Sequence, residues 1–207
     1  IESMKRSMRT AMENKIPVLL DLVGVACSDL RLDLARELLR IGHPAVLKGN
    51  MSELLAVSGL PSHAIGIDAG VEDALTEENI DGVSEVLKAF SRNNQAIVLA
   101  TGKQDFVTDG ERVVLVQNGS AALSGITGTG CMLGALCGTY LTEAAESRGQ
   151  AVLAAAAVMG IAGELGAENS RGPGSFQIAF LDALYDLQEE EIRNRLRLRE
   201  KIKQNFE

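Results

Sequence analysis

The sequence has 207 residues, of which 46% are hydrophobic and only 3% are aromatic. Its formal net charge of −8 argues against a nucleic-acid partner, because binding a phosphate backbone requires a basic patch. No run of about 18 apolar residues is present, so we expect no membrane-spanning helix. The longest apolar stretch, 151–162, is rich in alanine and predicts a helix of the protein core.

Cysteine and histidine usage favours a reducing compartment and no metal cluster. Cys27, Cys131 and Cys137 are odd in number and lack zinc-type spacing, which favours free thiols and a cytoplasmic location. His43 and His63 are too isolated in the sequence to form a metal cluster. The chain begins in what reads as the middle of a helix, without an initiator methionine or a signal peptide, so we expect that a segment precedes it.

Strands and helices alternate along the first half of the chain. The apolar patterns predict strands over 17–21, 45–49 and 95–101, and helices over 2–14, 31–41 and 76–93, with a further helix opening at 50–53 and loops over 22–30 and 59–70. This alternation predicts a mostly parallel sheet with right-handed crossovers, flanked by helices.

The second half begins with a hairpin signal and continues with helices. Asp109-Gly110 separates two apolar runs, 105–108 and 112–117, and predicts an antiparallel hairpin at the edge of the sheet. Two long apolar helices follow a glycine-rich stretch, and a further helix is expected over 177–187. The densely charged residues 188–207 are interpreted as a solvated helical face. We expect the whole chain, 1–207, to form a single α/β domain.

The segment Thr127-Gly128-Thr129-Gly130-Cys131 is the most distinctive feature of the sequence. Its two glycines allow a tight turn, and the apolar helix that follows is expected to be buried on most sides. The first N–H groups of a helix have no partners within it, and the helix dipole makes that end partly positive. The stretch therefore predicts an anion site, most plausibly for phosphate. The alternative is a glycine-rich turn that only lets a helix pack closely.

Three other features gather with this turn if the sheet is parallel, because ligands of such sheets bind beyond the carboxyl ends of the strands. They are Asp21, the segment 48–53 and Thr101-Gly102. Asp21 and Glu53 suit one Mg²⁺ held mainly through waters and phosphate oxygens. Alternatively, Asp21 caps a helix or loop, and Glu53 forms a capping box with Asn50. Lys48 suits a phosphate as a point charge, or is an exposed strand-end lysine.

Two further residues have open alternatives. The Thr101 hydroxyl suits a nucleotide phosphate, or belongs to the turn before Gly102. The helix start favours the thiolate of Cys131, whereas an adjacent phosphate disfavours it, so its role as a general base stays open. Cys137 is expected to lie inert in the core.

Five motifs in register resemble those of the hydroxyethylthiazole kinase family, in the ribokinase-like superfamily, and the resemblance covers essentially the whole chain. They are Leu20-Asp21-x-Val23-Gly24, Lys48-Gly49-Asn50-x-Ser52-Glu53, Thr101-Gly102-x-x-Asp105 with Thr108-Asp109-Gly110, Thr127-Gly128-Thr129-Gly130-Cys131, and Gly172-Pro173-Gly174-Ser175-Phe176. The resemblance implies transfer of the ATP γ-phosphoryl group to the primary alcohol of 4-methyl-5-(2-hydroxyethyl)thiazole, with Mg²⁺, in a homotrimer.

The resemblance also implies roles for individual residues, which stand as follows. Lys48, Asn50 and Thr101 are implied to contact ATP, and Asp21 and Glu53 to hold Mg²⁺ indirectly. Gly128 is implied to contact the thiazole and, with Thr129 and Gly130, to form an anion hole. Cys131 stands where most of the superfamily has an aspartate base. A loose phosphoryl-transfer transition state tolerates this replacement, because positioning and electrostatics dominate.

Three departures from the family pattern are visible. Leu22 stands where the family usually has proline, and Lys48 stands where arginine is frequent. The family's N-terminal segment, with the Asn and Met of the thiazole pocket, does not precede these motifs in the sequence. The alternative functions are therefore another ribokinase-like kinase, of a pyrimidine alcohol or hydrated nicotinamide nucleotide, and a non-catalytic nucleotide-binding or trimer-forming fragment. A Rossmann dehydrogenase is disfavoured, because no G-x-G-x-x-G follows the first strand.

Overall fold

The computed structural model describes residues 1–63, 70–73, 75–76, 78–143 and 147–201. The chain divides into two compact units, which are described separately. The first comprises Ile1–Gly102 with Phe106–Val113, and the second comprises Lys103–Asp105 with Val114–Glu207.

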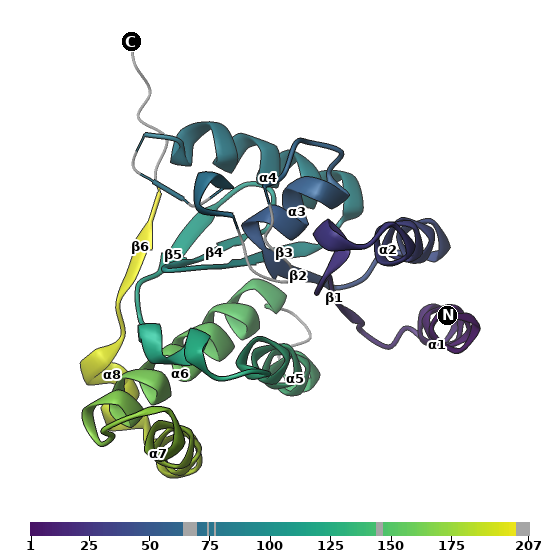
Figure 1. Cartoon of the computed structure of the whole chain (residues 1–207). Helices are drawn as coiled ribbons and strands as arrows, with labels where there is room; N and C mark the ends of the chain where they lie inside the picture. The colour runs from purple at the N-terminus through teal and green to yellow at the C-terminus, as the bar shows by residue number, and fades with distance from the viewer. Residues whose placement is uncertain (64–69, 74, 77, 144–146, 202–207) are drawn as a thin grey trace. The chain divides into compact units, whose positions relative to one another are not determined.

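The first unit is built on the strands β1 (Leu19–Asp21), β2 (Val46–Asn50), β3 (Ile97–Thr101) and β4 (Asp105–Thr108). β1 and β3 both pair in parallel with β2, and β4 pairs antiparallel with β3, as Figure 1 shows. Val46, Leu47, Val98 and Leu99 are completely buried. Strands without an exposed face read as continuous apolar runs, which is why the sequence revealed them as parallel strands.

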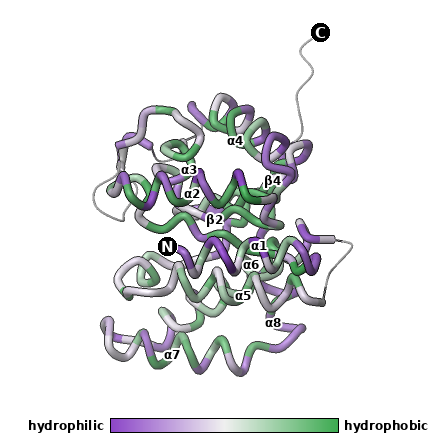
Figure 2. The backbone as a smooth tube through the Cα atoms, turned by 90° about the vertical axis from the view of Figure 1, so that its right-hand side faces the viewer, coloured by the Kyte–Doolittle hydropathy of each residue, from purple (hydrophilic) through white to green (hydrophobic). Residues whose placement is uncertain are grey.

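The helices of the first unit are α1 (Glu2–Glu13), α2 (Asp29–Ile41), α3 (Met51–Val57) and α4 (Ile80–Asn94), with short 3₁₀ turns η1 (Val25–Cys27) and η2 (Val71–Asp73). Hydrophobic and hydrophilic residues alternate along α2 and α4 in Figure 2, as expected for helices that bury one face. Ser28 caps α2 by accepting a hydrogen bond from the N–H of Arg31 at 3.4 Å.

Three sequence predictions for this unit need correction or restriction. The helix expected from residue 76 begins at Ile80, and the side chain of Asn79, its N-cap residue, accepts the N–H of Thr76 at 2.9 Å. The predicted loop over 22–30 contains η1 and the first turn of α2. The predicted loop over 59–70 falls in large part on residues 64–69, which lie outside the described residues.

The second unit contains β5 (Val113–Val116), η3 (Ala121–Gly125), α5 (Thr129–Glu143), α6 (Arg148–Glu168), α7 (Pro173–Asp186), α8 (Glu189–Arg195) and β6 (Leu198–Glu200). α6 packs against both α5 and α7 (Figure 1). A side chain at Gly166 would meet the Cα atom of Phe180 at 2.8 Å, so glycine there permits the close approach of α6 and α7. Phe176 and Phe180 stack with ring centroids 5.9 Å apart.

The charged tail differs from its prediction as a single solvated helical face. It forms the short helix α8 and then β6, which pairs antiparallel with β5 and places Glu200 opposite Val114. The expected hairpin strand β5 therefore has a further neighbour. The helix predicted from residue 177 begins earlier, at Pro173, which suits the first helical position because proline lacks an N–H.

α6 is long and apolar enough to cross a membrane by length and composition, the one such helix among the described residues. Within its most apolar window, 67% of the residues are buried inside the protein. Ala155, Ala156, Ile161 and Ala162 are fully buried. This burial agrees with the prediction of a core helix over 151–162.

Candidate functional site

Five residues lie at the carboxyl ends of β1, β2 and β3, and we call them the edge cluster: Asp21, Lys48, Asn50, Glu53 and Thr101. The strand register accounts for their proximity, since Asp21 lies opposite Lys48 and Asn50 lies opposite Thr101. Glu53 joins them from the first turn of α3, which begins directly after β2. The sequence prediction that these residues gather at one edge of a parallel sheet is confirmed.

Lys48 and Asp21 form a partly buried ion pair. The ammonium nitrogen lies 2.9 Å from Oδ2 of Asp21, with 5% of the lysine side chain and 22% of the aspartate side chain exposed. Oδ1 of Asp21 accepts the N–H of Val23 at 3.2 Å. The reading of Lys48 as an exposed strand-end lysine is therefore wrong. Burial of two charges is costly unless they are paired, so each holds the other in place.

Glu53 ties two backbone segments together through its carboxylate. Oε1 accepts the N–H of Gly24 at 2.7 Å, and Oε2 accepts the N–H of Asn50 at 2.8 Å. Asn50 returns a hydrogen bond by accepting the N–H of Glu53 at 2.9 Å, which completes the capping box that the sequence left as an alternative. Burial raises the pKa of Glu53, and the two N–H groups and Lys48 oppose this rise.

Gly24 and Leu22, which follow β1, each meet a structural requirement of this edge of the sheet. Gly24 adopts φ +75°, and a side chain there would collide with the Arg31 guanidinium at 2.2 Å. Leu22, where the family usually has proline, donates its N–H to the carbonyl of Lys48 at 2.7 Å and is buried. Proline could not make this bond. Leucine therefore extends the β1–β2 pairing by one residue.

Thr101 is half-buried at the end of β3. Its hydroxyl donates a long hydrogen bond of 3.4 Å to the carbonyl of Gly49 on the neighbouring strand. This contact belongs to the sheet, and the hydroxyl oxygen retains acceptor capacity at the rim.

The donor set of the edge cluster fits a hard divalent cation. Within the described part of the chain, no group of three or more histidine, cysteine, aspartate or glutamate side chains is placed to hold a metal. Mg²⁺ keeps several waters and is bound in nucleotide sites by one or two carboxylates together with phosphate oxygens. Asp21 and Glu53 offer those carboxylates from one edge, each already oriented by backbone N–H groups.

The glycine-rich turn, residues 127–131, lies in the second unit and is open to solvent. Gly128 adopts φ +100°, and a side chain added there would meet no atom within 4 Å. Thr127, Gly128, Gly130 and Cys131 are exposed. The prediction that the helix is buried on most sides is wrong: α5 buries one face through Leu133, Cys137 and Leu141, whereas Ala135 and Thr139 are exposed.

The hydrogen bonds of this turn leave the helix start unsatisfied. The Thr129 hydroxyl donates to the carbonyls of Leu123 at 3.0 Å and Ile126 at 3.2 Å, so it fixes the turn. The first intrahelical bond runs from the N–H of Met132 to the carbonyl of Gly128 at 2.9 Å. Among the described residues, none accepts the N–H groups of Thr129, Gly130 or Cys131. Such groups at a helix N-terminus bind anions.

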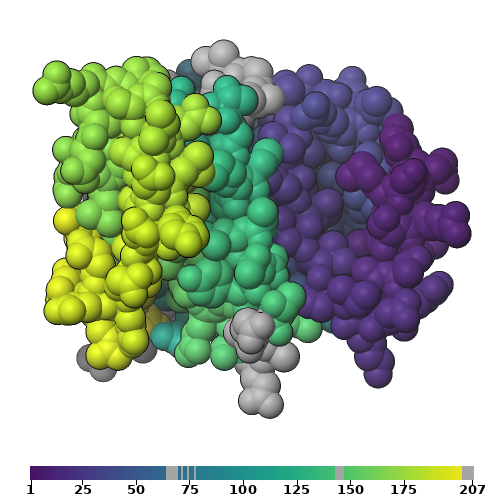
Figure 3. Space-filling model, turned by 90° about the horizontal axis from the view of Figure 1, so that it is seen from below, coloured from purple at the N-terminus to yellow at the C-terminus, as the bar shows by residue number. Residues whose placement is uncertain are grey.

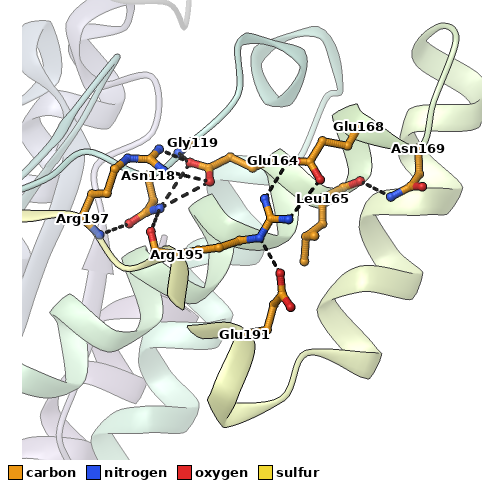
Figure 4. Close-up of polar contacts among 9 residues, drawn as sticks. All are labelled: Asn118, Gly119, Glu164, Leu165, Glu168, Asn169, Glu191, Arg195 and Arg197. Atoms are coloured by element: carbon orange, nitrogen blue, oxygen red, sulfur yellow. Dashed lines mark hydrogen bonds and ion pairs between the residues drawn. The ribbon is translucent and has the colours of Figure 1, made fainter. Parts of the chain in front are cut away.

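Sequence reasoning missed the residues that fix the start of the loop leading to this turn. Glu164 accepts the N–H of Gly119 at 2.7 Å and also contacts Asn118 and Arg197, as Figure 4 shows. Asn118 in turn accepts the N–H of Arg197 at 2.8 Å. The available signal was Glu164, the one acid within the apolar run 151–167, because a buried carboxylate requires partners.

Comparisons with known proteins agree on one family. The model of the hydroxyethylthiazole kinase family matches residues 1–190. Hydroxyethylthiazole kinase 2 of Clostridium botulinum (strain 657 / Type Ba4) is 41% identical over 198 residues, which are 96% of this chain and 74% of the relative. Hydroxyethylthiazole kinase of Nitratidesulfovibrio vulgaris (strain DP4) is 42% identical over 188 residues, 90% of this chain and 67% of the relative.

Solved structures agree with these relatives. The hydroxyethylthiazole kinase protein from Pyrococcus horikoshii OT3 superposes with a TM-score of 0.81 at 32% identity, covering 97% of this chain and 72% of that one. Pyridoxal kinase from Staphylococcus aureus, at 16% identity and a TM-score of 0.57 over 97% of this chain and 69% of that chain, shares the fold. The expected ribokinase-like α/β fold is confirmed.

Proposed function

Since the chain belongs to the hydroxyethylthiazole kinase family, we propose that it transfers the γ-phosphoryl group of ATP to the hydroxyl of 4-methyl-5-(2-hydroxyethyl)thiazole in thiamine salvage. The observation that carries this proposal is the open start of α5. Three consecutive backbone N–H groups there have no acceptor among the described residues, and no side chain covers Gly128.

In the proposed reaction the substrate hydroxyl oxygen attacks the γ-phosphorus, and the bond from that phosphorus to the β–γ bridging oxygen breaks to release ADP. The N–H groups of Thr129, Gly130 and Cys131 donate to the equatorial oxygens of the transferring group, where negative charge is spread. The helix dipole adds to this stabilisation. Gly128 lets the thiazole approach the backbone closely, since it carries no side chain.

The proposal also assigns nucleotide and metal contacts to the edge cluster. Lys48, Asn50 and Thr101 contact ATP through an ammonium, an amide and a hydroxyl. Asp21 and Glu53 hold Mg²⁺ through water, and that ion neutralises the β- and γ-phosphates when bound. Glu53 also keeps the Gly24 loop against α3, so it orients the edge whether or not it touches a metal-bound water.

Cys131 is the candidate to receive the substrate proton, since its thiol is exposed at the helix start. The proton has an alternative destination in the phosphate itself or in solvent, because a loose transition state develops little charge on the attacking oxygen. We therefore assign Cys131 a secondary role.

We further propose a homotrimer in the cytoplasm. The three cysteines are free thiols, which supports a reducing compartment. Ile178, Leu181 and Tyr185 form an exposed apolar stripe on α7, a helix on the face seen in Figure 3, and such a stripe is suited to contact between subunits. Sedimentation velocity tests the assembly: a trimer is expected, and a monomer at micromolar concentration would contradict it.

Phosphorylation of the thiazole alcohol by ATP tests the activity. The chain is incubated with ATP and the alcohol, with and without Mg²⁺, and the phosphate ester is quantified by ³¹P NMR. We expect product that depends on Mg²⁺. No product from this chain, and none from a version extended at its N-terminus, would remove the proposal.

A further inference from the structure

Lys48 places its ammonium against the carboxylate of Asp21, one of the two acids that the proposed function assigns to the metal. Its ammonium lies 2.9 Å from Oδ2, and 5% of its side chain is exposed. Asp21 and Lys48 are opposed in the register of the parallel strands β1 and β2, so the sheet itself keeps the two side chains together. The pair is a consequence of the fold and does not depend on a ligand.

The Lys48 ammonium and a divalent cation would compete for the carboxylate of Asp21. Asp21 and Glu53 carry two negative charges in the ionised state, and Lys48 supplies one positive charge that acts on both. A divalent cation that approached Asp21 would meet the ammonium at close range. Lys48 could not leave alone, because a buried ammonium without an anion is strongly disfavoured.

A nucleotide phosphate offers the Lys48 ammonium another anion, so the lysine can leave Asp21 without losing its counter-charge. The lysine stem is flexible and its ammonium is a point charge with three rotatable donors, so it can exchange a carboxylate for a phosphate oxygen without reorienting a planar group. An arginine, frequent in the family here, would have to break a fork-shaped contact instead.

We propose that Lys48 is an internal counter-cation that excludes the divalent metal from Asp21 until a nucleotide phosphate draws the ammonium away. Metal binding by the edge cluster is then coupled to nucleotide binding. By linkage the coupling is reciprocal, so the metal also strengthens nucleotide binding by the same factor. This inference rests on the proposed function for the identity of the phosphate ligand.

The test is a Mn²⁺ titration of the whole chain without nucleotide, with free Mn²⁺ counted by electron paramagnetic resonance. The unmodified protein is expected to bind Mn²⁺ weakly. Lys48→Met removes the competing charge at similar length, and we expect its Kd for Mn²⁺ to fall by about 10-fold, from the Coulomb energy of a unit and a divalent charge about 6 Å apart in water.

Two control variants distinguish an effect at Asp21 from an effect of the protein's net charge on Mn²⁺ affinity. Lys5→Met removes a lysine from another ion pair, in which its ammonium lies 2.7 Å from Glu37, and should leave the Mn²⁺ affinity unchanged. Lys48→Met combined with Asp21→Asn should lose the gain, because the charge of the vacated carboxylate is what attracts the hydrated metal. Equal Mn²⁺ affinities of the unmodified protein and Lys48→Met would overturn the proposal, even if the chain phosphorylates the thiazole alcohol.

A second measurement on the unmodified protein covers the case in which Lys48→Met does not fold. The ¹H–¹⁵N resonance of the Lys48 ammonium is followed by NMR while ADP is added in EDTA, and separately while Mg²⁺ is added alone. We expect ADP to shift this resonance and Mg²⁺ alone to leave it in place. A shift with millimolar Mg²⁺ alone would contradict the exclusion of metal by Lys48. The phosphorylation assay stays independent of both results.

Discussion

The proposed function assigns phosphate contacts to both the edge cluster and the glycine-rich turn, but the polar groups of the two regions are arranged differently. At the edge cluster, side chains already satisfy one another: Lys48 pairs with Asp21, and both oxygens of Glu53 accept backbone N–H groups. At the turn, the first N–H groups of α5 have no acceptor in the part of the chain that the structure describes, and the Thr129 hydroxyl fixes the loop. Substitutions at the cluster should therefore act mainly on metal and nucleotide affinity, whereas substitutions at the turn should act on the rate of transfer.

The largest effect is expected from Gly128→Val. A β-branched residue is strained at φ +100° even though space is available, so the N–H groups that follow should be displaced. We expect kcat to fall by roughly 10²–10³, the cost of losing an oxyanion-hole donor. Gly125→Ala is the matched control, because its side chain would also meet no atom within 4 Å and no positive φ is required. Equal kcat values of the two variants in steady-state kinetics would refute the assignment of this turn as the site of phosphoryl transfer.

Cys131→Ala should have a smaller effect on the same rate. We expect kcat to fall by less than about 100-fold, since loss of a full general base typically costs 10²–10⁴. The KM for ATP should stay within a factor of about two if the thiol is not a binding group. A decrease near the top of the general-base range would identify the thiol as the base and would weaken the claim that backbone groups dominate at the turn.

Glu53→Gln should raise the Mg²⁺ concentration needed for half-maximal activity by about 10-fold, as for other residues that orient metal ligands. The amide keeps one acceptor oxygen, so one of the two N–H groups now bonded to the carboxylate loses its partner. Denaturant unfolding should show reduced stability in the same variant. Reduced stability with an unchanged Mg²⁺ titration would limit Glu53 to capping and loop attachment.

The smallest effect concerns pH and His63, which contacts Asp73 and Glu72. Asp73 hydrogen-bonds the His63 ring at 2.8 Å and, with Glu72, raises the pKa of His63 above its usual 6.5. The resulting stabilisation is present below pH 6.5 and is lost as the pH rises through the raised pKa. In urea unfolding, the stability gap between the unmodified protein and His63→Gln should therefore narrow from pH 6 to pH 8.

His43→Gln is the control for this prediction, because the His43 ring contacts the neutral carbonyl of Asn94. Its effect on stability should change less over the same pH range. A gap for His63→Gln that stayed constant or widened toward pH 8 would show that Asp73 does not hold a charged imidazole.

The sequence was most informative where one physical requirement determined the residue. Continuous apolar strands revealed the parallel sheet, and the parallel sheet placed Asp21, Lys48 and Glu53 at one edge. Glycines before an apolar helix indicated the open helix start. These features are local, or follow from a topology that is itself locally encoded.

The features that escaped prediction depend on contacts between distant residues. Glu164 reaches Gly119 across 45 positions, and β6 forms only because β5 offers it a partner. The ion pair of Lys48 with Asp21 spans 27 positions and required the exact strand register. Spacing alone could not distinguish this buried pair from an exposed lysine at the end of a strand.

Amide chemical shifts at the glycine-rich turn test the account most directly. A ¹H–¹⁵N correlation spectrum is recorded while a non-hydrolysable ATP analogue and Mg²⁺ are added. We predict that the amide protons of Thr129, Gly130 and Cys131 move downfield as their N–H groups donate to phosphate, while the amide of Gly125 stays in place. Saturation of the nucleotide site with no movement of these three amides would contradict the assignment of the helix start as the phosphate site.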